Sequence, residues 1–147
     1  MNRQLAIGIF VIALQTTDNA VARDDHKMYP IADALQTQAA KDKLDPAIKL
    51  YFGTQKHPTV TKELGEWKTN KKTNGFNKSD KEACEWVFLS AVLEMQERAQ
   101  KEGGNAVVNI KSNYKNIERS SEKEYMCGSG ALMSGVALKG KVVKLSR

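Results

Sequence analysis

Cysteine and histidine can bind metals and act in catalysis, and both are scarce in this 147-residue chain. There are two cysteines, Cys84 and Cys127, and two histidines, His26 and His57. The four positions share no spacing of the kind that zinc sites use, so we expect neither a metal site nor a bound cofactor. The chain also has no C-x-x-C pair of the kind found in redox enzymes. The histidines are interpreted as surface residues without a chemical task.

Catalytic motifs are also scarce. Glutamate pairs such as Glu94 with Glu97 could act as general acid and base, but acids on charged helices and loops are usually only solvated. Residues 135–141 match the G-x-x-x-x-G-K start of a nucleotide-binding loop. Val142 stands where such a loop needs Ser or Thr for magnesium, and too few residues follow for a phosphate-binding helix. We therefore interpret this match as spurious and predict a protein without enzymatic activity.

The remaining chemistry of the sequence is charge. Lys and Arg number 23 against 17 acids, which gives a formal net charge of +6. From Gln55 to Lys81 the chain is polar and basic, with Trp67 as its one large anchor. This stretch is predicted to be a long loop, which either keeps the protein in solution or faces an anionic partner. The candidate anion-binding or partner-binding surface consists of Lys68, Lys71, Lys72, Lys78, Lys81 and Trp67.

Residues 1–22 have the pattern of a secretory signal peptide. Arg3 precedes the apolar run Leu5–Leu14, and Ala20-Val21-Ala22 forms an A-x-A cleavage site. The run covers only about half of the ~30 Å hydrocarbon core of a bilayer, and no second such run follows, so no transmembrane segment is expected in the mature chain. We predict cleavage at this site and a single domain over residues 23–147, in the periplasm or outside the cell.

Export bears on both the partners and the cysteines. Outside the cytoplasm the accessible polyanions are lipopolysaccharide, phospholipid headgroups and peptidoglycan-associated polymers, so we expect no nucleic acid partner. In an oxidising compartment two cysteines most simply form one disulfide, here Cys84–Cys127. A bridge across so long a loop is worth about 4 kcal/mol in the chain-entropy model.

The clearest local pattern is a helix that begins after Ser79 and runs to about Glu102. Ser79 opens a capping box with Glu82, and Gly103-Gly104 ends the helix. At 100° per residue, the expected core stripe consists of Cys84, Phe88, Ala91, Val92, Met95 and Ala99. A second apolar helix face, nearly opposite, consists of Trp86, Leu89 and Leu93. This second face must be covered either by the N-terminal segment of the chain or by a partner chain.

Short elements are expected before the basic stretch. Pro30 makes residues 28–35 an edge strand or an entry segment, because proline lacks the backbone donor that a central strand needs. Thr37 is predicted to cap a short helix that ends at Leu44. Apolar and polar residues alternate over residues 48–52, which indicates a half-buried strand.

A strand meander is expected after the helix, over residues 105–112, 124–127 and 133–145. In the first of these strands, Ala106, Val108 and Ile110 lie on one face. Asn74-Gly75, before the helix, is predicted to form a tight turn. The order of elements predicts an α+β fold of two layers, with one long helix packed on a small, mainly antiparallel sheet.

Several short motifs together resemble a known family. They are Leu50–Gln55, Asn70–Asn74, Asn77–Asp80, Glu82–Cys84, Arg98–Ala99, Lys101–Ile110 and Gly135–Gly140. The chain resembles small exported proteobacterial proteins that often carry the automatic label "excinuclease ATPase subunit". We judge that label wrong, because an excinuclease ATPase needs phosphate-binding loops, signature motifs and zinc modules that this sequence lacks.

Two more remote groups share the helix ending R-A-x-x-x-G-G-N-A-V-V, followed by a strand and a cysteine-bearing strand. The sequence is similar to the cysteine-bridged domain of the envelope stress-sensing lipoprotein of the Rcs phosphorelay, and to YbjQ-type proteins labelled as heavy-metal binders. The similarity implies a helix on a small sheet with a bridge from helix to strand. The stress sensor has four cysteines and a lipid anchor, whereas this chain has two cysteines and no such anchor, so the signalling role is not carried over.

The sequence therefore predicts a non-enzymatic periplasmic or secreted binding module that associates with the envelope through its basic loop. Two alternatives stay open: a metal-binding envelope protein, which the remote resemblance implies, and a small envelope hydrolase, which would need a cleft of converging acids. The expected partner is an envelope protein or an anionic envelope component. A homo-oligomer also stays open.

Overall fold

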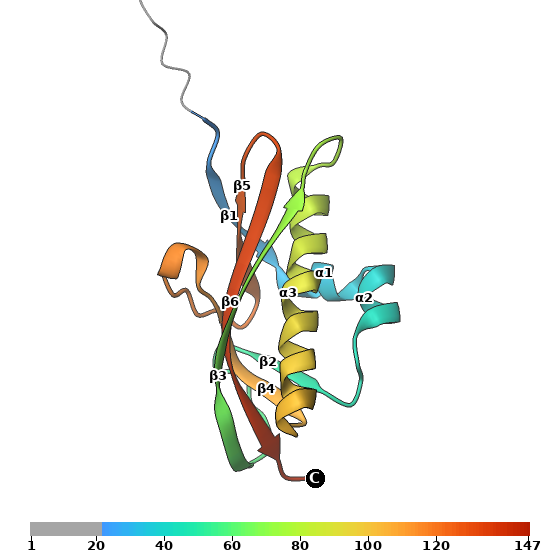
Figure 1. The fold of residues 1–147 in the computed structure, drawn as a ribbon, viewed down its shortest axis with the longest axis vertical. Helices are drawn as coiled ribbons and strands as arrows, with labels where there is room; N and C mark the ends of the chain where they lie inside the picture. Colours follow the sequence, from blue (N-terminus) through green and yellow to red (C-terminus); the bar gives the residue numbers. More distant parts are fainter. Residues whose placement is uncertain (1–21) are drawn as a thin grey trace, which may run out of the picture.

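The computed structural model describes residues 22–147, which form a curled sheet with a long helix on one face (Figure 1). The predicted signal peptide lies outside the described residues except for Ala22. Within residues 22–147, no helix has both the length and the apolar character needed to cross a bilayer. The elements in chain order are β1 (Asp25–Pro30), α1 (Ile31–Gln36), α2 (Gln38–Lys43), β2 (Lys49–Phe52), β3 (Val60–Asn74), α3 (Asp80–Glu102), β4 (Ala106–Ser112), the 3-10 turn η1 (Tyr114–Asn116), β5 (Glu124–Ser129) and β6 (Met133–Leu145).

Strand β6 organises the sheet. It pairs with β3 along one side, and with β5 and then β4 along the other, which gives the strand order β1-β5-β6-β4-β2 with β3 off this path. All pairings are antiparallel except that of β2 with β4. Helix α3 packs on one face of this sheet (Figure 1). The predicted two-layer α+β fold is confirmed.

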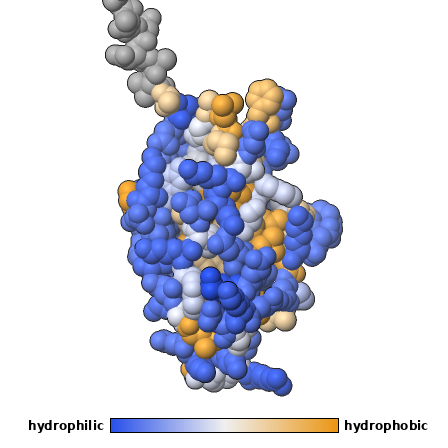
Figure 2. All heavy atoms as spheres, in the orientation of Figure 1, coloured by the Kyte–Doolittle hydropathy of each residue, from blue (hydrophilic) through white to orange (hydrophobic). Residues whose placement is uncertain are grey.

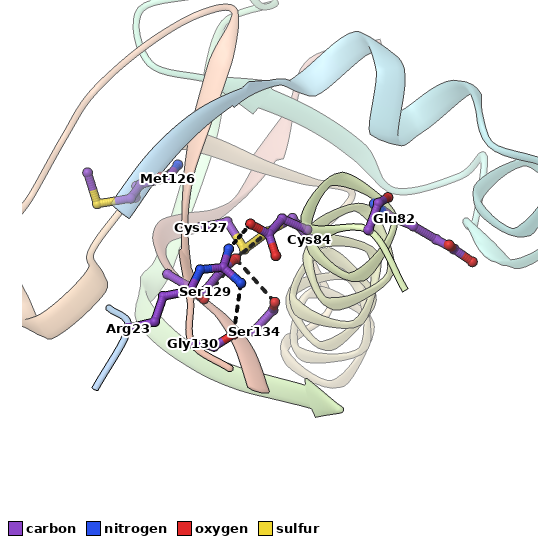
Figure 3. Close-up of a disulfide and its surroundings, with 12 residues drawn as sticks. Arg23, Glu82, Cys84, Met126, Cys127, Ser129, Gly130 and Ser134 are labelled. Atoms are coloured by element: carbon purple, nitrogen blue, oxygen red, sulfur yellow. Dashed lines mark hydrogen bonds and ion pairs between the residues drawn. A yellow bond between two sulfur atoms is a disulfide. The ribbon is translucent and has the colours of Figure 1, made fainter. Parts of the chain in front are cut away.

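Helix α3 begins and ends where its capping residues predict. The Ser79 side chain accepts a hydrogen bond from the Glu82 amide at 3.1 Å, and Gly103 ends the helix with a φ of 78°, a left-handed conformation that glycine adopts without strain. Figure 3 shows the disulfide that joins this helix to the sheet. The Cα atoms of Cys84 and Cys127 are 5.9 Å apart, and the predicted bridge is confirmed.

The second apolar face of α3 is covered mainly by the chain's own α1 and α2. Leu89 is buried and Leu93 is partly buried, and both belong to the same core as the buried residues of the two short helices. Trp86 stays 44% exposed, and the Lys43 ammonium lies 4.8 Å from the centre of its ring. Of the two alternatives for this face, the N-terminal segment is therefore the one that covers Leu89.

The prediction of a long basic loop over residues 55–81 is wrong, because most of it is strand β3. This strand pairs with β6 from Val60 opposite Leu145 to Asn74 opposite Met133. Among the described residues β6 is its one partner, so β3 is an edge strand, where lysines are common because they discourage pairing with other chains. The predicted tight turn at residues 74–75 is instead a connection into α3.

The predicted single apolar face of β4 is also wrong. Ala106 and Val108 pack in a small second cluster, whereas Ile110 packs in the main core beside α3. Asn109 has a φ of 52°, and the pairing with β6 shifts between Val108 and Lys111. Such a bulge reverses the side-chain alternation that follows it.

Candidate functional site

The two faces of β3 have different surroundings. Lys71 lies on the side of α3, where its ammonium pairs with the Glu94 carboxylate at 2.5 Å. Lys68 and Lys72 are three positions and one position from Lys71, both odd separations, so they lie on the opposite side of the strand. We call this side of the sheet, which faces away from α3, the outer face. Lys72 is opposite Gly135 of β6 on this face.

The structure does not bring the six predicted surface residues together. Lys81 pairs with Asp33 at 2.8 Å near the start of α3, and Lys78 lies in the exposed connection before that helix. Trp67 packs against the core on the side of α3, under the guanidinium of Arg98 at 5.4 Å. Only Lys68 and Lys72 of the predicted set remain on the outer face.

A row of three lysines crosses the outer face. Lys68 of β3, Lys139 of β6 and Lys111 of β4 are directly opposite one another on neighbouring strands. Like charges at opposed positions destabilise a sheet, and here two carboxylates offset them. Glu118 contacts Lys139 at 2.6 Å and Lys111 at 3.3 Å, while Glu66 contacts Lys139 at 3.2 Å. Within residues 22–147 no carboxylate pairs with Lys68, so its charge is available to a ligand.

Beside Lys68, the outer face is hollowed into a cleft of about 190 Å³, which we call the outer-face cleft. Its lining contains two lysines and three asparagines and no carboxylate. Lys115, on its rim, donates a hydrogen bond to Asp24 at 2.9 Å. This bond raises the pKa of Lys115 and lowers the pKa of Asp24. The lining residues are Lys68, Thr69, Asn70, Asn113, Lys115, Asn116 and Ala137.

The wall of this cleft is held to the sheet by Tyr114. A Cβ atom added to Gly128 of β5 would lie 2.2 Å from the Tyr114 oxygen, and one added to Gly135 would lie 3.4 Å from its ring. The ring therefore rests on glycine positions of two paired strands, and it contacts the ring of His26 edge-on at 5.0 Å between centroids. The backbone amide of Asn113 also donates to Ala137 of β6 at 2.8 Å.

The turn that forms the wall is strained. Lys115 and Asn116 have φ angles of 53° and 61°, a left-handed conformation that costs a residue with a Cβ about 1 kcal/mol and that asparagine tolerates best. Left-handed lysine persists where the surroundings impose it, and such strain concentrates at functional sites. Here Tyr114 and the bonds of Asn113 impose it, and the result places an ammonium group at the cleft.

The other candidate residues from the sequence analysis lie outside the outer-face cleft. Both cysteines are in the disulfide, and within residues 22–147 no group of three or more His, Cys, Asp or Glu residues could hold a metal ion. The nucleotide-loop match over residues 135–141 lies inside strand β6, whose extended backbone differs from a phosphate-cradling loop. The ring of His57 lies 5.4 Å from that of Tyr51.

Sequence reasoning identified Lys68 but not the rest of the cleft. The sequence predicts no helix or strand for the segment between the strands expected at residues 105–112 and 124–127. Its Asn-Tyr-Lys-Asn order could have indicated a turn, because asparagines favour turns that contain left-handed residues. The proximity of residues 68–70 to residues 113–116 depends on strand pairing that the sequence does not display.

Comparisons of the chain with protein-family profiles, with curated proteins and with solved structures returned no match.

Proposed function

We propose that this protein is a non-enzymatic binding module of the bacterial envelope that holds an anionic group of an envelope component in the outer-face cleft. The observation that carries the proposal is the lining of the cleft. Lys68 and Lys115 line it together with three asparagines, and no carboxylate of the described residues is in the lining, although the Lys115 ammonium is bound to Asp24. Ammonium groups supply charge and primary amides supply donors, and both are what a phosphate or carboxylate binds.

The way the cleft is built favours binding over catalysis. Its polar side chains are three amides, two ammonium groups and the hydroxyl of Thr69, and the bond to Asp24 raises the pKa of Lys115. A general base that could activate the Thr69 hydroxyl is not among them. A paired strand and a pinned turn present these groups, so little backbone entropy is lost when a ligand binds.

Location outside the cytoplasm rests on two features. The disulfide joins α3 to the sheet, and structural disulfides persist in oxidising compartments. The apolar run and A-x-A site of residues 1–22 have the pattern of an export signal. The anionic groups accessible there include the phosphates of lipopolysaccharide and the charged groups of wall polymers.

The test compares binding of purified lipopolysaccharide, and of the same material after dephosphorylation, by isothermal titration calorimetry. The variant K68Q/K115Q removes both ammonium groups of the cleft, and K41Q/K101Q removes two exposed lysines elsewhere, so the two variants have equal net charge. We expect K68Q/K115Q to bind about tenfold or more weakly, because each charge-assisted bond is worth roughly 1.5–3 kcal/mol. We expect the matched control to bind like the wild type.

Equal weakening in both variants would assign binding to net charge and contradict the cleft. Equal affinity for the dephosphorylated material would contradict recognition of phosphate. Thermal unfolding of both variants checks that the fold is retained.

A further inference from the structure

Three of the most exposed large hydrophobic side chains gather at one end of the molecule. Phe76 is 63% exposed in the connection between β3 and α3, and Leu132 and Met133 are 61% and 47% exposed in the β5–β6 hairpin. The two connections are joined, because the amide of Gly75 donates to the carbonyl of Leu132 at 2.8 Å. Figure 2 shows orange spheres at this end, at the top of the view. We call Phe76, Leu132 and Met133 the apolar tip.

Local hydrogen bonds hold both connections in place. The Asn74 side chain accepts a bond from the amide of Phe76 at 2.8 Å. The amide of Gly130 donates to the carbonyl of Met133 at 2.8 Å, which closes the hairpin around Ala131 and Leu132. Hairpin turns usually contain glycine, asparagine or aspartate. Leucine at such a position adds no turn stability and exposes apolar surface, so the stability of the fold does not account for it.

Charged groups of both signs surround the tip, and two of the cations are lysines without an ion-pair partner in the described part of the chain. Lys72 and Lys78 flank it, and neither pairs with a carboxylate within residues 22–147. Arg23 reaches the hairpin at the carbonyl of Gly130, as Figure 3 shows. The carboxylates nearby are those of Asp25 and Asp80, which Arg23 itself binds, and that of Glu82 in the first turn of α3.

The N-terminal side of the chain also enters at this end. Asp25 of β1 is opposite Ser129, the last residue of β5 before the hairpin turn. Residues 1–21, which contain the apolar run, therefore join the described part of the protein beside the apolar tip. Cleavage after Ala22 would place the new amino group of Arg23 there.

We propose that the apolar tip inserts into the surface of an anionic phospholipid bilayer. Apolar side chains on two adjoining turns can enter the acyl boundary without exposing strand edges, and flanking lysines are attracted to anionic headgroups. A protein partner would also bury apolar surface, but Lys72 and Lys78, which are unpaired among the described residues, and the entry of the chain at this end favour an anionic bilayer. This inference uses residues apart from the outer-face cleft, so either can fail alone.

The experiment uses protein recovered from the periplasm of an expressing bacterium, with its N-terminus determined by mass spectrometry. Binding to vesicles of equal parts phosphatidylethanolamine and phosphatidylglycerol is measured by co-sedimentation, with pure phosphatidylcholine vesicles as the uncharged comparison. The variant F76S/L132S removes the tip. The matched control is I117S, because Ile117 is 59% exposed but follows η1, away from the tip.

We expect F76S/L132S to bind anionic vesicles about 100-fold more weakly, roughly tenfold for each apolar side chain withdrawn from lipid. We expect I117S to bind like the wild type, and F76W to bind with its added tryptophan quenched by brominated lipid. Weaker binding of the wild type to phosphatidylcholine than to the anionic vesicles would support the role of Lys72 and Lys78.

Three outcomes would overturn the proposal. The first is that the wild-type protein does not bind anionic vesicles, or that I117S weakens binding as much as F76S/L132S does. The second is vesicle binding that K68Q/K115Q abolishes and F76S/L132S leaves intact, which would assign lipid binding to the cleft. The third is a wild-type dimer, seen by sedimentation velocity, that F76S/L132S dissociates while vesicle binding is unchanged, which would make the tip a self-association surface.

Discussion

Replacing Gly128 with alanine tests how the cleft wall is anchored. The added Cβ would lie 2.2 Å from the Tyr114 oxygen and 2.3 Å from the adjoining ring carbon, closer than any real contact. Gly128 is buried and pairs with His26 on one side and Gly135 on the other, so the strand cannot move away. Tyr114 is only half-buried and must leave instead.

We expect G128A to lower the free energy of unfolding by about 2 kcal/mol, within the usual range for overpacking. Urea denaturation at neutral pH measures it. Y114S removes the obstructing ring, so the double variant Y114S/G128A should be no less stable than Y114S alone. The coupling between the two sites is then about 2 kcal/mol, as expected for residues in direct contact.

Two other glycines supply graded controls. A Cβ at Gly135 would lie 3.4 Å from the Tyr114 ring, and one at Gly75 would lie 3.7 Å from its nearest neighbour, so G135A should cost less than G128A and G75A should cost nothing. Additive effects of G128A and Y114S, or wild-type stability of G128A, would refute the anchoring role. Displacement of the wall should also weaken lipopolysaccharide binding in G128A.

Two further predictions concern stability. The variant C84A/C127A opens a loop of 43 positions and should lose about 4 kcal/mol of unfolding free energy, measured by urea denaturation. The wild type with reductant should lose the same amount. A loss below about 1 kcal/mol, or a variant whose stability still changes with reductant, would contradict this prediction. The bond from Lys139, and then that from Lys111, lowers the pKa of Glu118 below its ordinary 4.5. Ionised Glu118 therefore stabilises the fold fully above pH 4.5, and this stabilisation is lost as the pH falls through the lower pKa of Glu118 in the folded protein. E118Q should flatten the thermal stability profile in the acid range, and a profile equal to that of the wild type would argue against this role.

Much of α3 and its surroundings could be predicted from local sequence. Ser79 and Gly103 mark the helix ends, because their side-chain and backbone properties meet the needs of unpaired helix termini. The apolar positions of the helix identify both of its covered faces. The disulfide follows from two cysteines and an export pattern. These features depend on residues close in sequence, so an amphipathic pattern or a capping residue is enough to predict them.

Strand β3 could not be predicted in this way. Lysines occupy both sides of it, so the alternation that identifies a half-buried strand is missing. Lys71 lies on the side of α3, where Glu94 of the helix neutralises its charge. Likewise, the bulge at Asn109 reverses the facing of Ile110, and nothing in the residues around it fixes where the register shifts.

The amino-acid sequence by itself determined a capped long helix, a cysteine pair suited to bridging, an export pattern and a surplus of positive charge. The tertiary structure decided where that charge lies. Pairing of β3 with β6 divided the predicted basic surface between two faces and brought Lys68 beside Lys115. The physical reason is that strand pairing joins residues far apart in the chain, and local propensity does not encode the partner of an edge strand.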